Sequence, residues 1–174
     1  MRAATRLATP RHLVLNSCPA VSFQSAEVYA LTKAGVDERV AASFLVRLAQ
    51  LAAAGVSRWQ AQRVVVDSAD EAIRAAIAEA QFELTEQTWA QFTVWSGYDP
   101  SSDLTDLVAP TLATFGDTDQ VTPVHESAAR LQALAGPVVR TTVFANADHR
   151  LRVGSEYAPD YLDTVTEWCL RSAA

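Results

Sequence analysis

The sequence predicts a mixed α/β fold: a small parallel sheet with a helical insertion. Three short apolar stretches have the composition of buried strands, at 12–19, 110–116 and 138–144. Helical periodicity follows the second and third of them, at 124–135 and 159–171. No short glycine-rich turn joins two strands, and parallel neighbours need crossover connections, so we expect a parallel sheet with right-handed crossovers. In the closing helix, one face is expected to be shared by Tyr161, Leu162, Val165, Trp168 and Cys169.

A long alanine-rich region with helical spacing separates the first two strands. One apolar stripe on its second helix consists of Val40, Phe44, Leu45, Leu48 and Leu51. The predicted helix caps are Asp37, Ser68 paired with Glu71, and Thr85, and the predicted helix ends precede Gly35 and Gly55. We therefore assign residues 24–95 to a helical insertion and residues 1–23 and 96–174 to the α/β core.

Composition excludes several classes of function. The 174 residues carry a formal charge of -6 and only one lysine, Lys33, which argues against a nucleic-acid surface. No apolar stretch reaches the roughly 18 residues of a membrane span, and no secretory signal is evident, so we expect a cytoplasmic protein. Cys18 and Cys169 are predicted to be buried free thiols. Without a metal-ligand cluster or a glycine-rich phosphate loop, we expect no cofactor and no metal.

Two loops carry the residues of chemical interest. Asp119 follows the second predicted strand and His149 follows the third. Because parallel strands end at the same edge of a sheet, the two side chains are expected to meet there. A carboxylate on one imidazole nitrogen fixes the tautomer, which leaves the other nitrogen free to accept a proton. The sequence therefore predicts an acid–base pair.

The motifs in these loops resemble those of the α/β-hydrolase superfamily. GDTDQVTP, at 116–123, is similar to the Gly-x-x-Asp-x-x-Val-Pro-Pro signature of the family's acid, and NADH, at 146–149, to its Gly-x-x-His, with Asn146 in the usual glycine place. The stretch from Val14 to Leu31 resembles the sixth strand and its exit into a cap, as in acyl-peptidase and dienelactone-hydrolase-like members. The resemblance implies the last three strands of the hydrolase sheet, a helical cap, and Asp119 and His149 as acid and base.

The family's Gly-x-Ser-x-Gly nucleophile elbow has no counterpart in this sequence. By the resemblance, the chain begins just after the place of that serine, so the oxyanion hole is missing as well. The strand at 12–18 would then lack a neighbour on one side. We expect a complementary N-terminal-half hydrolase chain there, or a homodimer.

Three functions remain open at this stage. The first is acyl hydrolysis or transfer, on an ester, thioester or peptide, with the nucleophile supplied by a partner chain. The second is nucleophile-free chemistry by His149 on a small molecule, such as hydration, elimination or cyclisation. The third is a non-catalytic binding or scaffold role. The residues we expect to contact substrate are Ser17, Trp95 and Tyr98; Ser17 and Cys18 are disfavoured as substitute nucleophiles.

Overall fold

The computed structural model describes residues 12–63, 71, 74–75 and 84–171, and the chain divides into two compact units. The first spans Met1–Val21 and Asp99–Ala174 and is called the sheet unit here; the second, Ser22–Tyr98, is called the helical unit. Ser68, the first residue of the predicted capping box with Glu71, lies outside the described residues, so this box is not tested.

Three parallel strands form the centre of the sheet unit: β1 (Leu13–Asn16), β2 (Thr111–Gly116) and β3 (Val139–Phe144). β2 lies between the other two and is buried along its whole length. The predicted parallel α/β arrangement is therefore confirmed. Its order in space, β1-β2-β3, follows the order of the strands along the chain.

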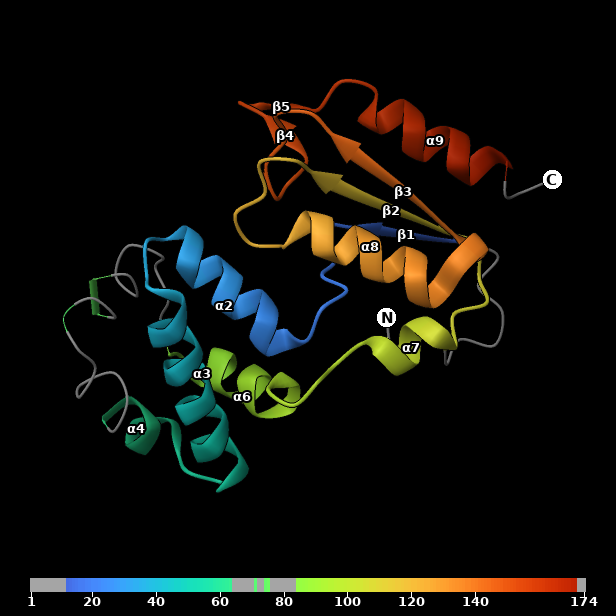
Figure 1. Cartoon of the computed structure of the whole chain (residues 1–174). Helices are drawn as coiled ribbons and strands as arrows, with labels where there is room; N and C mark the ends of the chain where they lie inside the picture. The colour runs from blue at the N-terminus through green and yellow to red at the C-terminus, as the bar shows by residue number, and fades with distance from the viewer. Residues whose placement is uncertain (1–11, 64–70, 72–73, 76–83, 172–174) are drawn as a thin grey trace. The chain divides into compact units, whose positions relative to one another are not determined.

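Two helices cover opposite faces of this sheet, α8 (Val124–Ala135) and α9 (Tyr161–Arg171) (Figure 1). Ala113, Phe115 and Val139 pack in one cluster with residues of α8. Phe144, whose side chain points to the other face, contacts Tyr161 of α9 with a ring-centroid distance of 5.6 Å. The short helices α7 (Ser101–Thr105) and η2 (Gly136–Val138) connect to β2 and β3.

The segment between β3 and α9 differs from the prediction. A two-stranded hairpin of β4 (Arg152–Val153) and β5 (Glu156–Tyr157) was not predicted, because strands of two residues leave no periodic signal. α9 begins at Tyr161 instead of residue 159, since Asp160 has a φ of 63° and is not helical. Of the residues predicted to share a face of α9, Tyr161 is buried, whereas Leu162 is 57% exposed.

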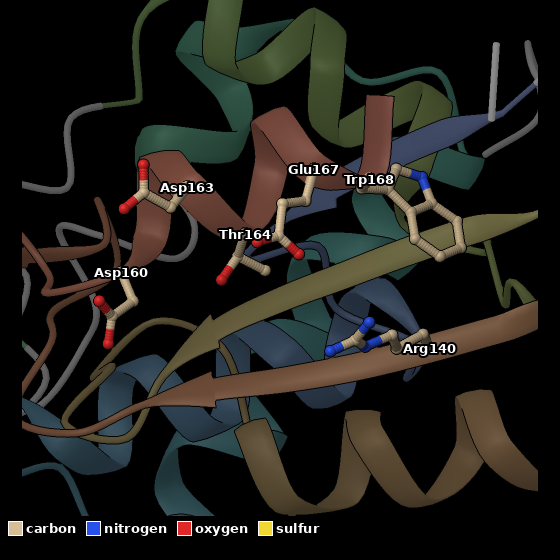
Figure 2. Close-up of a pocket in the computed structure, with 6 residues that line it drawn as sticks. All are labelled: Arg140, Asp160, Asp163, Thr164, Glu167 and Trp168. Carbon is tan, nitrogen blue, oxygen red and sulfur yellow. The ribbon is translucent and has the colours of Figure 1, made fainter. Parts of the chain in front are cut away.

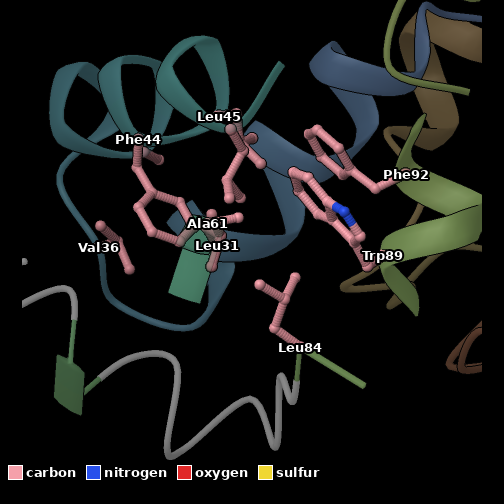
Figure 3. Close-up of a cluster of buried hydrophobic side chains, with 10 residues drawn as sticks. Leu31, Val36, Phe44, Leu45, Ala61, Leu84, Trp89 and Phe92 are labelled. Carbon is pink, nitrogen blue, oxygen red and sulfur yellow. The ribbon is translucent and has the colours of Figure 1, made fainter. Parts of the chain in front are cut away.

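The helical unit contains α2 (Phe23–Lys33), α3 (Glu38–Ala53), α4 (Arg58–Ala61) and α6 (Glu86–Trp95). Two of the predicted caps are confirmed: the side chain of Asp37 accepts hydrogen bonds from two amides of α3, and that of Thr85 accepts one from the amide of Thr88. Figure 3 shows the core of this unit, where Trp89 stacks on Phe92 and donates its indole N–H to the carbonyl of Val56. The predicted apolar stripe of α3 belongs to this cluster.

In the sheet unit, one arginine of α8 binds both of the chain segments that connect to the helical unit. We call residues 20–21 and 99–101 the junction segments. Arg130 donates from Nε to the carbonyl of Ala20, 2.8 Å away, and forms an ion pair with Asp99 at 3.3 Å. One guanidinium group therefore fixes both junction segments to the same helix.

Candidate active site

The structure brings together the two residues predicted to form the acid–base pair. Asp119 lies three residues beyond the end of β2, and His149 five residues beyond the end of β3. Nδ1 of His149 is 3.0 Å from Oδ2 of Asp119, which is hydrogen-bonding distance. The side chain of Asp119 has no exposed surface, whereas that of His149 is 42% exposed. The imidazole thus has one edge on a buried carboxylate and remains accessible to solvent.

Backbone amides hold the other oxygen of the Asp119 carboxylate. Oδ1 accepts the N–H of Val121 at 2.7 Å and that of Thr122 at 2.9 Å. This pattern is an Asx turn, which Asp forms readily because its side chain reaches the amides two and three residues further on. With Oδ1 used in this way, Oδ2 is the oxygen that faces the imidazole.

The loop that carries His149 is fixed by its own neighbours. The carboxylate of Asp148 accepts the amides of Arg150 and Arg152, at 2.8 and 2.9 Å. Asn146 has a φ of 57°, a conformation that Asn tolerates better than most residues. The loop is also joined to the turn of Asp119, since the hydroxyl of Thr118 donates to the carbonyl of Ala147 at 2.7 Å.

Close approach of these two loops requires a glycine at the end of β2. A Cβ added to Gly116 would lie well below contact distance from the carbonyl oxygens of Ala147 and Asp148, which are backbone atoms. Gly116 therefore allows the backbone just before His149 to pass directly over the end of the strand that leads to Asp119.

The pair is arranged as an ion pair over the middle of the pH range. Burial alone raises the pKa of Asp119, but hydrogen bonds from His149, Thr122 and Val121 and the charge of His149 outweigh it, so the pKa is lowered. The hydrogen bond to Asp119 raises the pKa of His149; burial and Arg150 oppose this, while the charges of Asp119 and Asp148 add to it. Chemically, this arrangement stabilises an imidazolium and directs Nδ1–H towards the carboxylate, as general acid–base chemistry at Nε2 requires.

The residues predicted to contact substrate lie in both units. Ser17 directly follows β1 in the sheet unit, is 4% exposed and has a φ of 46°; its carbonyl accepts the hydroxyl of Thr122 at 2.9 Å. Trp95 and Tyr98 belong to the helical unit, where their rings meet edge to face at 5.1 Å. Contact of these three residues with a common substrate remains a prediction.

The thiols are half-buried instead of fully buried, and neither forms a disulfide. Burial raises the pKa of the Cys18 thiol, which makes it a poor nucleophile.

Sequence reasoning missed Thr122 and the role of Gly116. The only sequence signal for Thr122 was its place three residues after Asp119, because in an Asx turn the backbone amide at this position donates a hydrogen bond to the aspartate carboxylate. Its second bond, to Ser17, joins residues far apart in the chain and has no local signal.

A hollow of about 250 Å³ lies between β3 and α9 (Figure 2). Its lining is mostly polar and charged: Arg140, Asp160, Asp163, Thr164, Glu167 and Trp168. Since neither Asp119 nor His149 lines it, we do not connect it with the acid–base pair.

Within the described part of the chain, no group of three or more His, Cys, Asp or Glu residues is arranged to hold a metal ion, and no helix is long and apolar enough to cross a membrane. Comparison with protein-family models, with curated proteins and with solved structures found no match.

Proposed function

We propose that this protein is an α/β-hydrolase-like half-enzyme that takes part in the hydrolysis or transfer of an acyl group, with the attacking nucleophile supplied by a partner chain. The observation that carries the proposal is the 3.0 Å contact between His149 Nδ1 and the buried Oδ2 of Asp119. An ester, thioester or peptide is the expected substrate class. The motif resemblance at both loops supports the same chemistry.

The two residues have separate roles in the proposed reaction. Nε2 of His149 takes the proton of the attacking hydroxyl as that oxygen forms a bond to the acyl carbon. The imidazolium, stabilised by Asp119, then returns this proton to the leaving group as its bond to the acyl carbon breaks. Water or another acceptor repeats the sequence on the acyl intermediate, which restores the nucleophile and the neutral imidazole.

The partner is expected along β1, which is an edge strand of the sheet among the described residues. The amides of Leu13 and Ser17 donate to the carbonyls of Pro110 and Thr114 on the β2 side. In a parallel ladder the alternate residues, Val14 and Asn16, direct their backbone groups to the opposite side. We propose that a complementary N-terminal-half hydrolase chain pairs there and places its nucleophile near His149. A second copy of this chain would cover the same edge without supplying a nucleophile elbow. Within the sheet unit, Ser17 at the end of β1 is the residue proposed to contact the substrate; a cap role for the helical unit and substrate contacts by Trp95 and Tyr98 remain predictions from the sequence.

Hydrolysis of p-nitrophenyl esters by the purified chain, with and without the polypeptides that copurify with it, tests the proposal. We expect turnover, and labelling of a partner serine by a fluorophosphonate probe, only in the complex. Both should be lost in His149→Ala and retained in His125→Ala, a matched control because His125 is an exposed histidine on α8. Turnover that persists in His149→Ala, or its absence from every preparation, would refute the proposal.

A second candidate function is nucleophile-free proton transfer by His149 during hydration, elimination or cyclisation of a small molecule. It is favoured by the fact that the acid–base pair is complete within one chain and that His149 is accessible. Turnover of such a substrate by this chain alone, abolished in His149→Ala without any serine labelling, would establish it. If His149→Ala changes neither turnover nor ligand binding, the remaining function is non-catalytic binding.

A further inference from the structure

We infer that Thr122 is a positioning residue for His149: it fixes the Asp119 carboxylate against the imidazole by tying the turn of Asp119 to the end of β1. Thr122 is 1% exposed and makes two hydrogen bonds with different parts of the sheet unit. Its amide donates to Oδ1 of Asp119 at 2.9 Å, and its hydroxyl donates to the carbonyl of Ser17, also at 2.9 Å.

These two bonds belong to one residue, so they are mechanically linked. The bond to Ser17 sets the position and tilt of the Thr122 peptide, and that peptide carries one of the two amides that hold Oδ1. Rotation of the carboxylate would weaken its hydrogen bond to His149, because Oδ2 would no longer lie in line with the Nδ1–H bond. The Thr122 hydroxyl therefore acts on the imidazole through Asp119, without touching it.

The anchor at the other end is itself firmly held. Ser17 has a φ of 46°, a conformation that a serine rarely adopts unless its surroundings impose it. Its amide donates to the carbonyl of Thr114 at 2.8 Å, and its carbonyl accepts from Thr122. The side-chain hydroxyl of Ser17 is buried and has no hydrogen-bond partner among the described residues, so it adds nothing to this restraint. Independently of Thr122, the backbone of Ser17 is therefore held to β2 by the bond from its own amide to Thr114.

The inference concerns the pair used in the proposed function, but it is tested on the imidazole itself. NMR titration of the full chain measures the pKa of the His149 ring, which depends on how well the Asp119 carboxylate is aligned with it. In Thr122→Val, which keeps the shape and loses the hydroxyl, we expect the pKa of His149 to fall towards its ordinary value. The other charges that act on the ring, Asp148 and Arg150, are unchanged in this variant.

Thr111→Val is the matched control. Thr111 is also buried, lies at the opposite end of β2 and donates its hydroxyl to the carbonyl of Ala109 at 2.8 Å. We expect a general loss of stability in this variant but an unchanged titration of His149. Thr122→Ser and Thr122→Ala differ from each other only in the hydroxyl group, so comparing these two variants gives the test even if the valine variant does not fold. The serine variant should titrate like the natural protein, and the alanine variant like Thr122→Val.

A folded Thr122→Val or Thr122→Ala protein that titrates like the natural one would overturn the inference, as would an equal fall of the pKa in Thr111→Val. These results are independent of ester turnover. If the pKa of His149 falls in the Thr122 variants but the natural protein has no ester turnover, the positioning role stands and only the proposed function is refuted. If the natural protein turns over esters but the pKa of His149 is unchanged in the variants, the proposed function stands and the positioning role is refuted.

Discussion

Replacement of Asp119 by Asn tests the ion pair at the centre of the candidate site. The amide has nearly the shape of the carboxylate, and its oxygen can still accept the amides of Val121 and Thr122. Its NH₂ group, however, faces His149 Nδ1 and can only donate. The ring must then carry its proton on Nε2, which can no longer act as a base, so any His149-dependent turnover should fall by roughly 10³–10⁴-fold.

The loss of stability can be estimated from the contact. A hydrogen bond to a charged group contributes about 1.5–3 kcal/mol. Because His149 is 42% exposed, solvent screening reduces this to about 1 kcal/mol. The lowered pKa of Asp119 gives stability that is present above its ordinary value of 3.8 and lost as the pH falls through the folded value. The raised pKa of His149 gives stability that is present below 6.5 and lost as the pH rises through the folded value.

Both contributions are complete only between these values, so Asp119→Asn should destabilise the sheet unit more near pH 5 than at a pH above the raised pKa of His149. Amide hydrogen exchange of β2 measures this locally, without interference from the helical unit. Asp117→Asn is the control, since this exposed carboxylate lies in the same turn. An equal loss at both pH values, or the same loss in the control, would refute the reasoning.

Two further substitutions test other parts of the sheet unit. Gly116→Ala should force the loop of His149 away from β2, because the new Cβ meets the carbonyl of Ala147; we expect about 1–3 kcal/mol of destabilisation in denaturant unfolding. Gly97→Ala, where a Cβ meets nothing, should change little. Arg130→Met should speed amide hydrogen exchange in the junction segments, which lose their common anchor. Gln132→Met, an exposed position on the same helix, should leave that exchange unchanged.

Local sequence signals were sufficient to predict an element where its ends and caps depend on residues within the element or next to it. α8 has the predicted bounds, because apolar periodicity and a terminal glycine mark both ends. Asp37 caps α3 as predicted, since the side chain and the amides that it accepts lie within three residues of one another. The juxtaposition of Asp119 and His149 could also be predicted, because neighbouring parallel strands bring their following loops to the same edge of the sheet.

Contacts between distant segments needed the tertiary structure. The bond from Thr122 to Ser17, the approach of Ala147 to Gly116 and the burial of Asp119 each join parts of the chain that no short pattern relates. Ser17, with a φ of 46°, adopts a conformation unusual for serine where its backbone bonds to Thr114 and Thr122, far away in the chain. Sequence alone thus determined the three parallel strands, the helices after the second and third of them, and which two side chains meet, because these follow from short-range propensity and strand direction. Only the packed structure decided how the carboxylate is held, because that depends on long-range contacts.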